Sequence, residues 1–182
     1  MLGRDHALSG AFTFTAVAPV LHVTGPALLA GAVFTAGAAI LPDIDEPGST
    51  ISRTFGFFTG AFSWVIHKIS GGHHGDAIGL AGAAAAIYWH AGLSLVPLCI
   101  ALGAASHIAG DELTHGGCPL AWPVSGHKFH LLPRRLQITT GKFAEHWIVS
   151  TLLLAGLGYL LWRDTGLAGI VHHLYATRSA AS

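Results

Sequence analysis

Charged residues are scarce in this sequence. Asp, Glu, Lys and Arg make up 10% of the 182 residues, whereas a soluble domain carries about 25%. The acidic residues and the Lys and Arg residues number nine each, so the formal net charge is zero. No overall positive field indicates nucleic-acid binding, and we expect no nucleic-acid partner.

Cysteine is nearly absent as well. The two cysteines, Cys99 and Cys118, form no CxxC pair, which argues against a disulfide framework and favours two free thiols. The sequence also contains no HExxH motif, which argues against an intramembrane metalloprotease. Near the N-terminus, Arg4, Asp5 and His6 lead into an apolar stretch without a small-residue cleavage site. We therefore expect an uncleaved first membrane helix.

Apolar residues, in contrast, make up 52% of the chain, with 24 glycines among them and around them. Five apolar segments of about 16 residues follow one another at 7–22, 26–41, 77–92, 94–110 and 147–162. Glycine and alanine of this frequency are typical of closely packed membrane helices. The sequence predicts one all-α domain over residues 1–182: an integral membrane bundle of about four or five transmembrane helices, with a peripheral tail at 165–182. The Phe-rich segment 51–70 is expected to form an interfacial helix, with a sixth span as the alternative.

The polar residues gather at one end of this predicted bundle. If residues 42–76 do not cross the membrane, eight of the nine acidic residues and seven of the nine Lys and Arg residues emerge at the same end. By the positive-inside tendency, that end faces the cytoplasm. We expect a multi-pass protein of the bacterial inner membrane, in contact with membrane lipids, with its polar site on the cytoplasmic side.

Histidine is abundant, with 13 residues, and it is the commonest metal ligand. The stretch "SHIAGDELTHGG" places His107, Asp111 and His115 at intervals of four, which is one stripe of an α-helix. Glu112 falls off this stripe and is expected at the surface. The stretch "LPDIDEPGS" adds Asp43 and Asp45, which are spaced to bridge neighbouring metal ions. Taken singly, His107 and Asp111 could form an interhelical hydrogen bond, and the two aspartates could cap a turn. Their convergence with other polar helix ends favours a divalent-metal site, with zinc as the preferred ion and two or three ions in total.

Several motifs together resemble a known family. His6, "LPDID", "GGHH", "SHIAGDELTHGG" and "GKFAEH" occur in the order found in the bacterial membrane-bound metal-dependent hydrolases, the LexA-regulated ones included. That family is distantly similar to the helical zinc phospholipase C and single-strand nuclease superfamily. The resemblance covers residues 1–160 and implies seven metal ligands: His6, Asp43, Asp45, His73, His107, Asp111 and Glu145.

The sequence departs from the family at the third helix. The family reads HRG-x-THS there, whereas this chain reads "HHGDAIG", with Ile78 and Gly79 in place of the second His and the Ser. Three outcomes are open: Asp76 replaces the missing ligand, His115 reaches in from the following helix, or one metal position is lost. His74, which stands in place of the family's Arg, is a candidate proton donor together with His115 and His130.

These observations predict a metal-dependent hydrolase of a phosphoester, such as a phospholipid, that uses metal-activated water. The catalytic candidates are His74, His115 and Asp76, while Lys128, Arg134 and Arg135 are candidates for binding a phosphate or an anionic lipid. One alternative is a non-catalytic membrane protein with a structural metal. A second is a divalent-metal transporter, which the nearly uncharged helix centres disfavour.

Overall fold

The computed structural model describes residues 1–45, 95–121 and 124–164, together with the single residues 82, 84, 85, 87 and 89. Four α-helices occupy these ranges: α1 (Gly3–Val17), α2 (Gly25–Ile40), α6 (Leu95–Glu112) and α7 (Ser150–Asp164). A 3₁₀ helix, η1 (Leu41–Asp45), continues α2, and a π-helix, η2 (Ala144–Val149), precedes α7. The described part contains no strand, which confirms the all-α fold class there.

The helix ends follow the punctuation of the sequence. Gly25 adopts a positive φ of 60° directly before Pro26, and proline suits the first turn of a helix because it has no N–H to leave unpaired. Pro42 lies just beyond the end of α2, where the chain tightens into η1. Each of the four predicted segments that falls on described residues corresponds to one of the four α-helices, with its ends shifted by a few residues.

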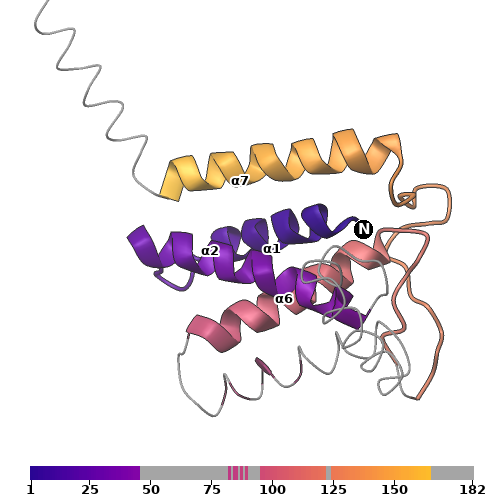
Figure 1. The fold of residues 1–182 in the computed structure, drawn as a ribbon, viewed down its shortest axis with the longest axis horizontal. Coiled ribbons are helices and arrows are strands. Elements are labelled where there is room, and N and C mark those ends of the chain that lie inside the picture. Colours follow the sequence, from indigo (N-terminus) through magenta and orange to yellow (C-terminus); the bar gives the residue numbers. More distant parts are fainter. Residues whose placement is uncertain are drawn as a thin grey trace, which may run out of the picture.

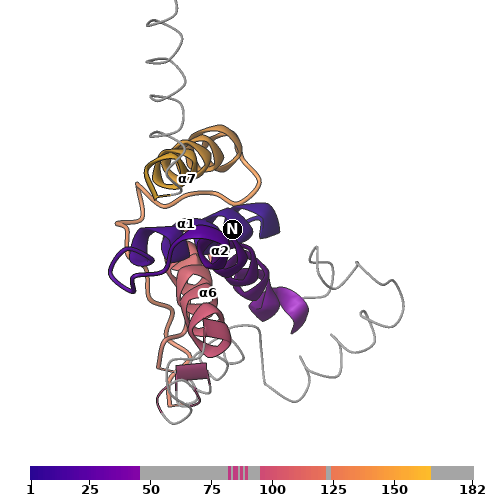
Figure 2. The same ribbon diagram turned by 90° about the vertical axis from the view of Figure 1, so that its left-hand side faces the viewer.

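The helices α1, α2 and α6 pack against one another, and α7 lies along α1 on the side away from α6 (Figure 1; Figure 2). Their shared core packs small side chains around two large ones, Phe14 and Leu28. Its members are Ala11, Phe14, Ala18, Leu28, Ala32 and Cys99. Phe14 is fully buried, and its ring occupies the space where a side chain at Gly31 would lie. Glycine in α2 therefore makes room for the ring from α1.

One helical segment of the described part, Gly25–Asp43, is long and apolar enough to cross a membrane. It comprises α2 and the start of η1 and has 19 residues. A buried helix of a soluble protein can meet the same criteria. The structure therefore supports one span, where the sequence predicted four or five. The segments 51–70 and 165–182 lie outside the described residues, and so does nearly all of the predicted span 77–92.

Candidate metal centre

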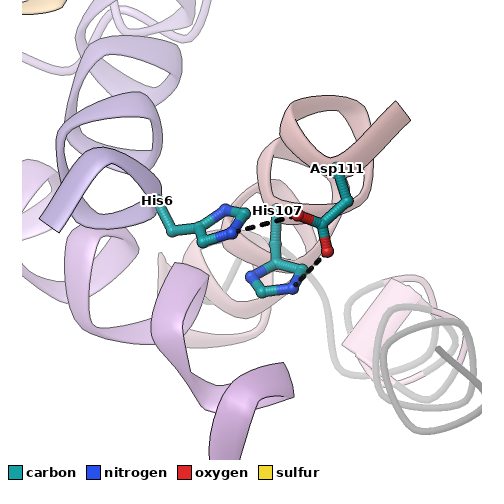
Figure 3. A group of neighbouring side chains, drawn as sticks. All are labelled: His6, His107 and Asp111. Atoms are coloured by element: carbon teal, nitrogen blue, oxygen red, sulfur yellow. Dashed lines mark ion pairs between the residues drawn. The ribbon is translucent and has the colours of Figure 1, made fainter. Parts of the chain in front are cut away.

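Three polar side chains meet where α1 begins and α6 ends. His6 comes from the first turns of α1, and His107 and Asp111 come from the last two turns of α6. His6 and His107 are fully buried, and Asp111 is 6% exposed. Figure 3 shows Asp111 reaching both rings. His6 Nε2 lies 3.3 Å from Asp111 Oδ1, and His107 Nε2 lies 3.3 Å from Asp111 Oδ2.

Small residues allow this approach. A Cβ at Gly103 would lie 2.6 Å from the Cβ of Ala38, so glycine lets α6 come close to the end of α2. A Cβ at Gly110 would lie 3.4 Å from the ring of His6. Gly103 therefore lets α6 approach α2, and Gly110 leaves room for the ring of His6. Sequence reasoning did not single them out, although glycines spaced seven apart along α6 were visible in the sequence.

The orientation of His107 is set by a backbone contact. Its Nδ1 lies 2.7 Å from the carbonyl oxygen of Ala39, at the end of α2. Because a carbonyl can only accept, Nδ1 donates this hydrogen bond, and Nε2 is the ring nitrogen that faces Asp111. This is the arrangement found in metal-ligating histidines, whose second nitrogen donates to a carbonyl or carboxylate.

His6 is suited to the same role. It stacks on His107 with a ring-centroid distance of 3.8 Å, and within the described structure its buried Nδ1 has no hydrogen-bond partner. Burial lowers the pKa of His6, which precedes the predicted span 7–22, and the contact with Asp111 offsets part of this. The ring is therefore held in the neutral form that binds a metal.

The three groups could hold a metal ion. One ligand atom from each of His6, His107 and Asp111 can be chosen so that all three lie within 4.8 Å of one another. Tetrahedral zinc with bonds of about 2.0–2.1 Å separates its ligands by about 3.3 Å. Asp111 has this spacing to each ring through a different oxygen, Oδ1 to His6 and Oδ2 to His107. Two nitrogens and one oxygen form a donor set that zinc accepts.

Of the other four ligands that the resemblance implies, Asp43 lies beside this group. Its Oδ1 lies 3.9 Å from His107 Nε2, and its side chain is 14% exposed, more than the three just described. The backbone of Asp45 ends η1, and its side chain lies outside what the structure describes. His73 lies outside the described residues, as do the catalytic candidates His74 and Asp76.

Glu145 is fully buried at the start of η2. Its two carboxylate oxygens accept backbone N–H groups, Oε1 from Leu2 and Oε2 from Gly141. Next to Leu2, the amino group of Met1 donates to Asp111 Oδ1 at 2.6 Å. Glu145 thus holds the backbone at Leu2, just before α1 begins, and the neighbouring residue Met1 contacts Asp111.

Two expectations about the end of α6 need correction. The helix ends at Glu112, so His115 leaves the stripe of His107 and Asp111. It is exposed, and its backbone N–H donates to the carbonyl of Ile138. Glu112, which the sequence placed at the surface, is buried at 7% exposure. The loop 113–140 folds back onto the helix end, and Leu131 N–H donates to the Glu112 carbonyl.

That loop brings a thiol to the site's edge. Cys118 is buried and exchanges backbone hydrogen bonds with Phe129. Burial, and then the negative charges of Asp111 and Glu112, raise the pKa of Cys118 to about 12. The thiol therefore stays protonated beside the carboxylates. The other loop candidates, Lys128, His130, Arg134 and Arg135, are exposed.

Comparison with known proteins identifies the family. No curated protein and no solved structure matches the chain significantly. The model of the YdjM inner membrane protein family matches residues 1–177, which is nearly the whole chain. The match supports a place in the inner membrane, in agreement with the composition and with the apolar segment Gly25–Asp43. The chain belongs to the YdjM inner membrane protein family.

Proposed function

We propose that this protein is a metal-dependent hydrolase of phosphoesters at the inner membrane, with His6, His107 and Asp111 as zinc ligands. The observation that carries the proposal is the convergence of these three buried donors within 4.8 Å. Catalytic zinc sites use three protein ligands and leave one position for water or substrate, whereas structural sites use four. Two imidazoles and one carboxylate are such a set of three.

Each residue has a distinct task in this proposal. Bound zinc supplies a Lewis acid for a phosphoryl oxygen and activates water at neutral pH. Asp111 contacts both rings and brings negative charge to the site. The Ala39 carbonyl keeps His107 in the tautomer that presents Nε2. Asp43 is the most exposed of the four side chains, and its carboxylate is placed to accept a proton from attacking water.

The proposal extends to the side of the membrane and the number of ions. The clustering of Lys and Arg residues at this end supports a cytoplasmic site. His6, His107 and Asp111 account for one ion. The second and third ions implied by the resemblance would draw on Asp45 and His73, because both carboxylate oxygens of Glu145 already accept backbone N–H groups.

Metal content and turnover, measured on one preparation, test the proposal. We expect detergent-purified protein to hold at least one zinc per chain and to hydrolyse bis(p-nitrophenyl) phosphate. Asp111→Asn should lose the zinc and lower turnover by about 100-fold or more. Asp164→Asn is the matched control, because Asp164 pairs with Arg163 at the other end of α7.

Three outcomes would overturn the proposal. Protein without zinc and without turnover would refute the metal centre itself. Zinc bound without turnover on any phosphoester would assign the cluster to a structural metal. Zinc flux into proteoliposomes that Asp111→Asn abolishes would make the protein a transporter.

A further inference from the structure

An apolar groove runs between α2 and α6, outside the metal centre. Its volume is about 500 Å³, within the range of small-molecule sites. Two of its side chains, Val33 and Phe34, are 72% and 59% exposed. We call it the α2–α6 groove, and the residues used here are Val33, Phe34, Gly37, Leu41, Val96 and Ile100.

The groove leads to the metal centre along α2. Ala38 lines the groove, and the next residue, Ala39, offers the carbonyl that orients His107. Leu41 also lines the groove, two residues before Asp43 in η1. A 3₁₀ helix rises about 2 Å per residue, so about 4 Å of helix separates the two. A molecule with an apolar chain in the groove would have its polar end beside Asp43, whose side chain is 14% exposed.

The surroundings of the groove indicate what occupies it. Its α2 and η1 residues all belong to Gly25–Asp43, the described segment that is able to span a membrane. The chain belongs to an inner membrane family, so we expect bilayer hydrocarbon next to this segment. The lining side chains are all apolar. Such a surface matches an acyl chain and offers nothing to a polar ligand.

We propose that the α2–α6 groove binds one acyl chain of a bilayer phospholipid and presents its phosphate to the His6–His107–Asp111 cluster. This inference rests on the proposed function and names its substrate class, a membrane phospholipid. The groove would select for a long chain, and the metal centre would act on the phosphoester at the chain's polar end.

Gly37 offers a way to fill the groove without moving the helices. A Cβ at this position would meet no atom within 4 Å, and the residue lines the groove. Gly37→Leu should therefore place a side chain where the acyl chain would lie. Gly158→Leu is the matched control, because Gly158 is an exposed glycine of α7 whose Cβ would also meet nothing within 4 Å.

The experiment compares substrates with and without long chains on zinc-loaded protein. The probes are bis(p-nitrophenyl) phosphate, phosphatidylglycerol with C18 chains and phosphatidylglycerol with C6 chains, the lipids in mixed micelles. We expect Gly37→Leu to raise KM for the C18 lipid about tenfold, the effect of losing contacts to roughly two methylene groups. Turnover of the soluble diester should not change, and Gly158→Leu should leave all three substrates unaffected.

The outcomes separate this inference from the proposed function. If the soluble diester is cleaved and Gly37→Leu leaves the C18-to-C6 preference unchanged, the groove is not an acyl site although the hydrolase stands. If no substrate is cleaved, the proposed function fails, and photo-crosslinking in vesicles of diazirine-acyl phosphatidylglycerol decides on the groove. Crosslinks to residues 33–41 that Gly37→Leu reduces, with those to α7 unchanged, would support acyl binding. Lipid crosslinks to residues 46–94 instead of residues 33–41 would overturn it.

Discussion

The same three helices meet in two different ways along their length. Around Phe14, α1, α2 and α6 contact one another through apolar side chains and alanines. Around His107 they meet through two imidazoles, a carboxylate and a carbonyl. The first contact is stabilised by close packing, which needs only the right volume. The second depends on contacts between particular polar atoms, and one missing group leaves its neighbours unsatisfied.

The comparison shows why this bundle end is suited to chemistry. A packed apolar region gains nothing from a cation, whereas two buried imidazoles and a carboxylate gain a shared partner when a metal binds. The packing around Phe14 and Gly103 also holds the helices that carry these three side chains in place without a metal. Preorganised ligands of this kind are what a metal centre requires.

The largest effect on stability is expected in the apolar region. Phe14→Ala removes a fully buried ring and should lower the free energy of unfolding by about 3–5 kcal/mol. Phe143→Ala is the control, because Phe143 is 72% exposed, and it should change little. Unfolding in mixed micelles titrated with SDS measures both. Equal losses in the two variants would contradict the core described here.

The second effect is the stabilisation by metal at the polar end. Zinc at about 100 times its Kd should raise the free energy of unfolding by about 2.7 kcal/mol, because it binds only the folded cluster. Asp111→Asn should abolish this increase and Asp164→Asn should preserve it. The measurement is unfolding with zinc and with EDTA. An equal zinc response in Asp111→Asn would place the metal elsewhere.

A third variant separates metal binding from backbone binding at the same end. Glu145→Gln replaces one acceptor oxygen with an NH₂ group, so the N–H of Leu2 or Gly141 loses its partner. We expect a loss of about 1–3 kcal/mol in unfolding free energy. The zinc-dependent increase should stay at its wild-type size. If that increase vanishes instead, Glu145 is a metal ligand, as the family resemblance implies.

The smallest effects come from adding one methyl group, and they should have opposite signs. Gly103→Ala places a Cβ 2.6 Å from that of Ala38 and should destabilise by about 1–3 kcal/mol. Gly158→Ala meets nothing within 4 Å and should stabilise by about 0.5–1 kcal/mol through helix propensity. The unfolding midpoints of the two variants, measured side by side, check this. Equal signs would contradict the close contact between α2 and α6.

Much of the helical framework could be predicted from the sequence. Apolar runs and the positions of Pro26 and Pro42 located the described helices to within a few residues. The spacing of His107 and Asp111 put both side chains on one face of α6, because the helical period is local. The expected gathering of polar helix ends also agrees with the contacts from α1 to α6 and from Leu2 to Glu145.

The surroundings of the α6 end, in contrast, depended on the loop that folds back onto it. His115 continued the spacing of four, but α6 ends at Glu112, where the chain turns back to pair with residues 129–138. The same loop buries Glu112 and Cys118. Nothing in the local pattern distinguishes a helix that continues for one more turn from one that a returning loop ends.

The sequence by itself determined that this chain is apolar and helical, with ligand-type residues at the helix ends, because composition and periodicity act over a few turns. Only the tertiary structure decided which of these residues meet. His6 and Asp111 are 105 positions apart and come together where Gly110 leaves room for the ring of His6. The Ala39 carbonyl orients His107 from a different helix. Such contacts depend on the shapes of two surfaces at once, and no single stretch of sequence encodes them.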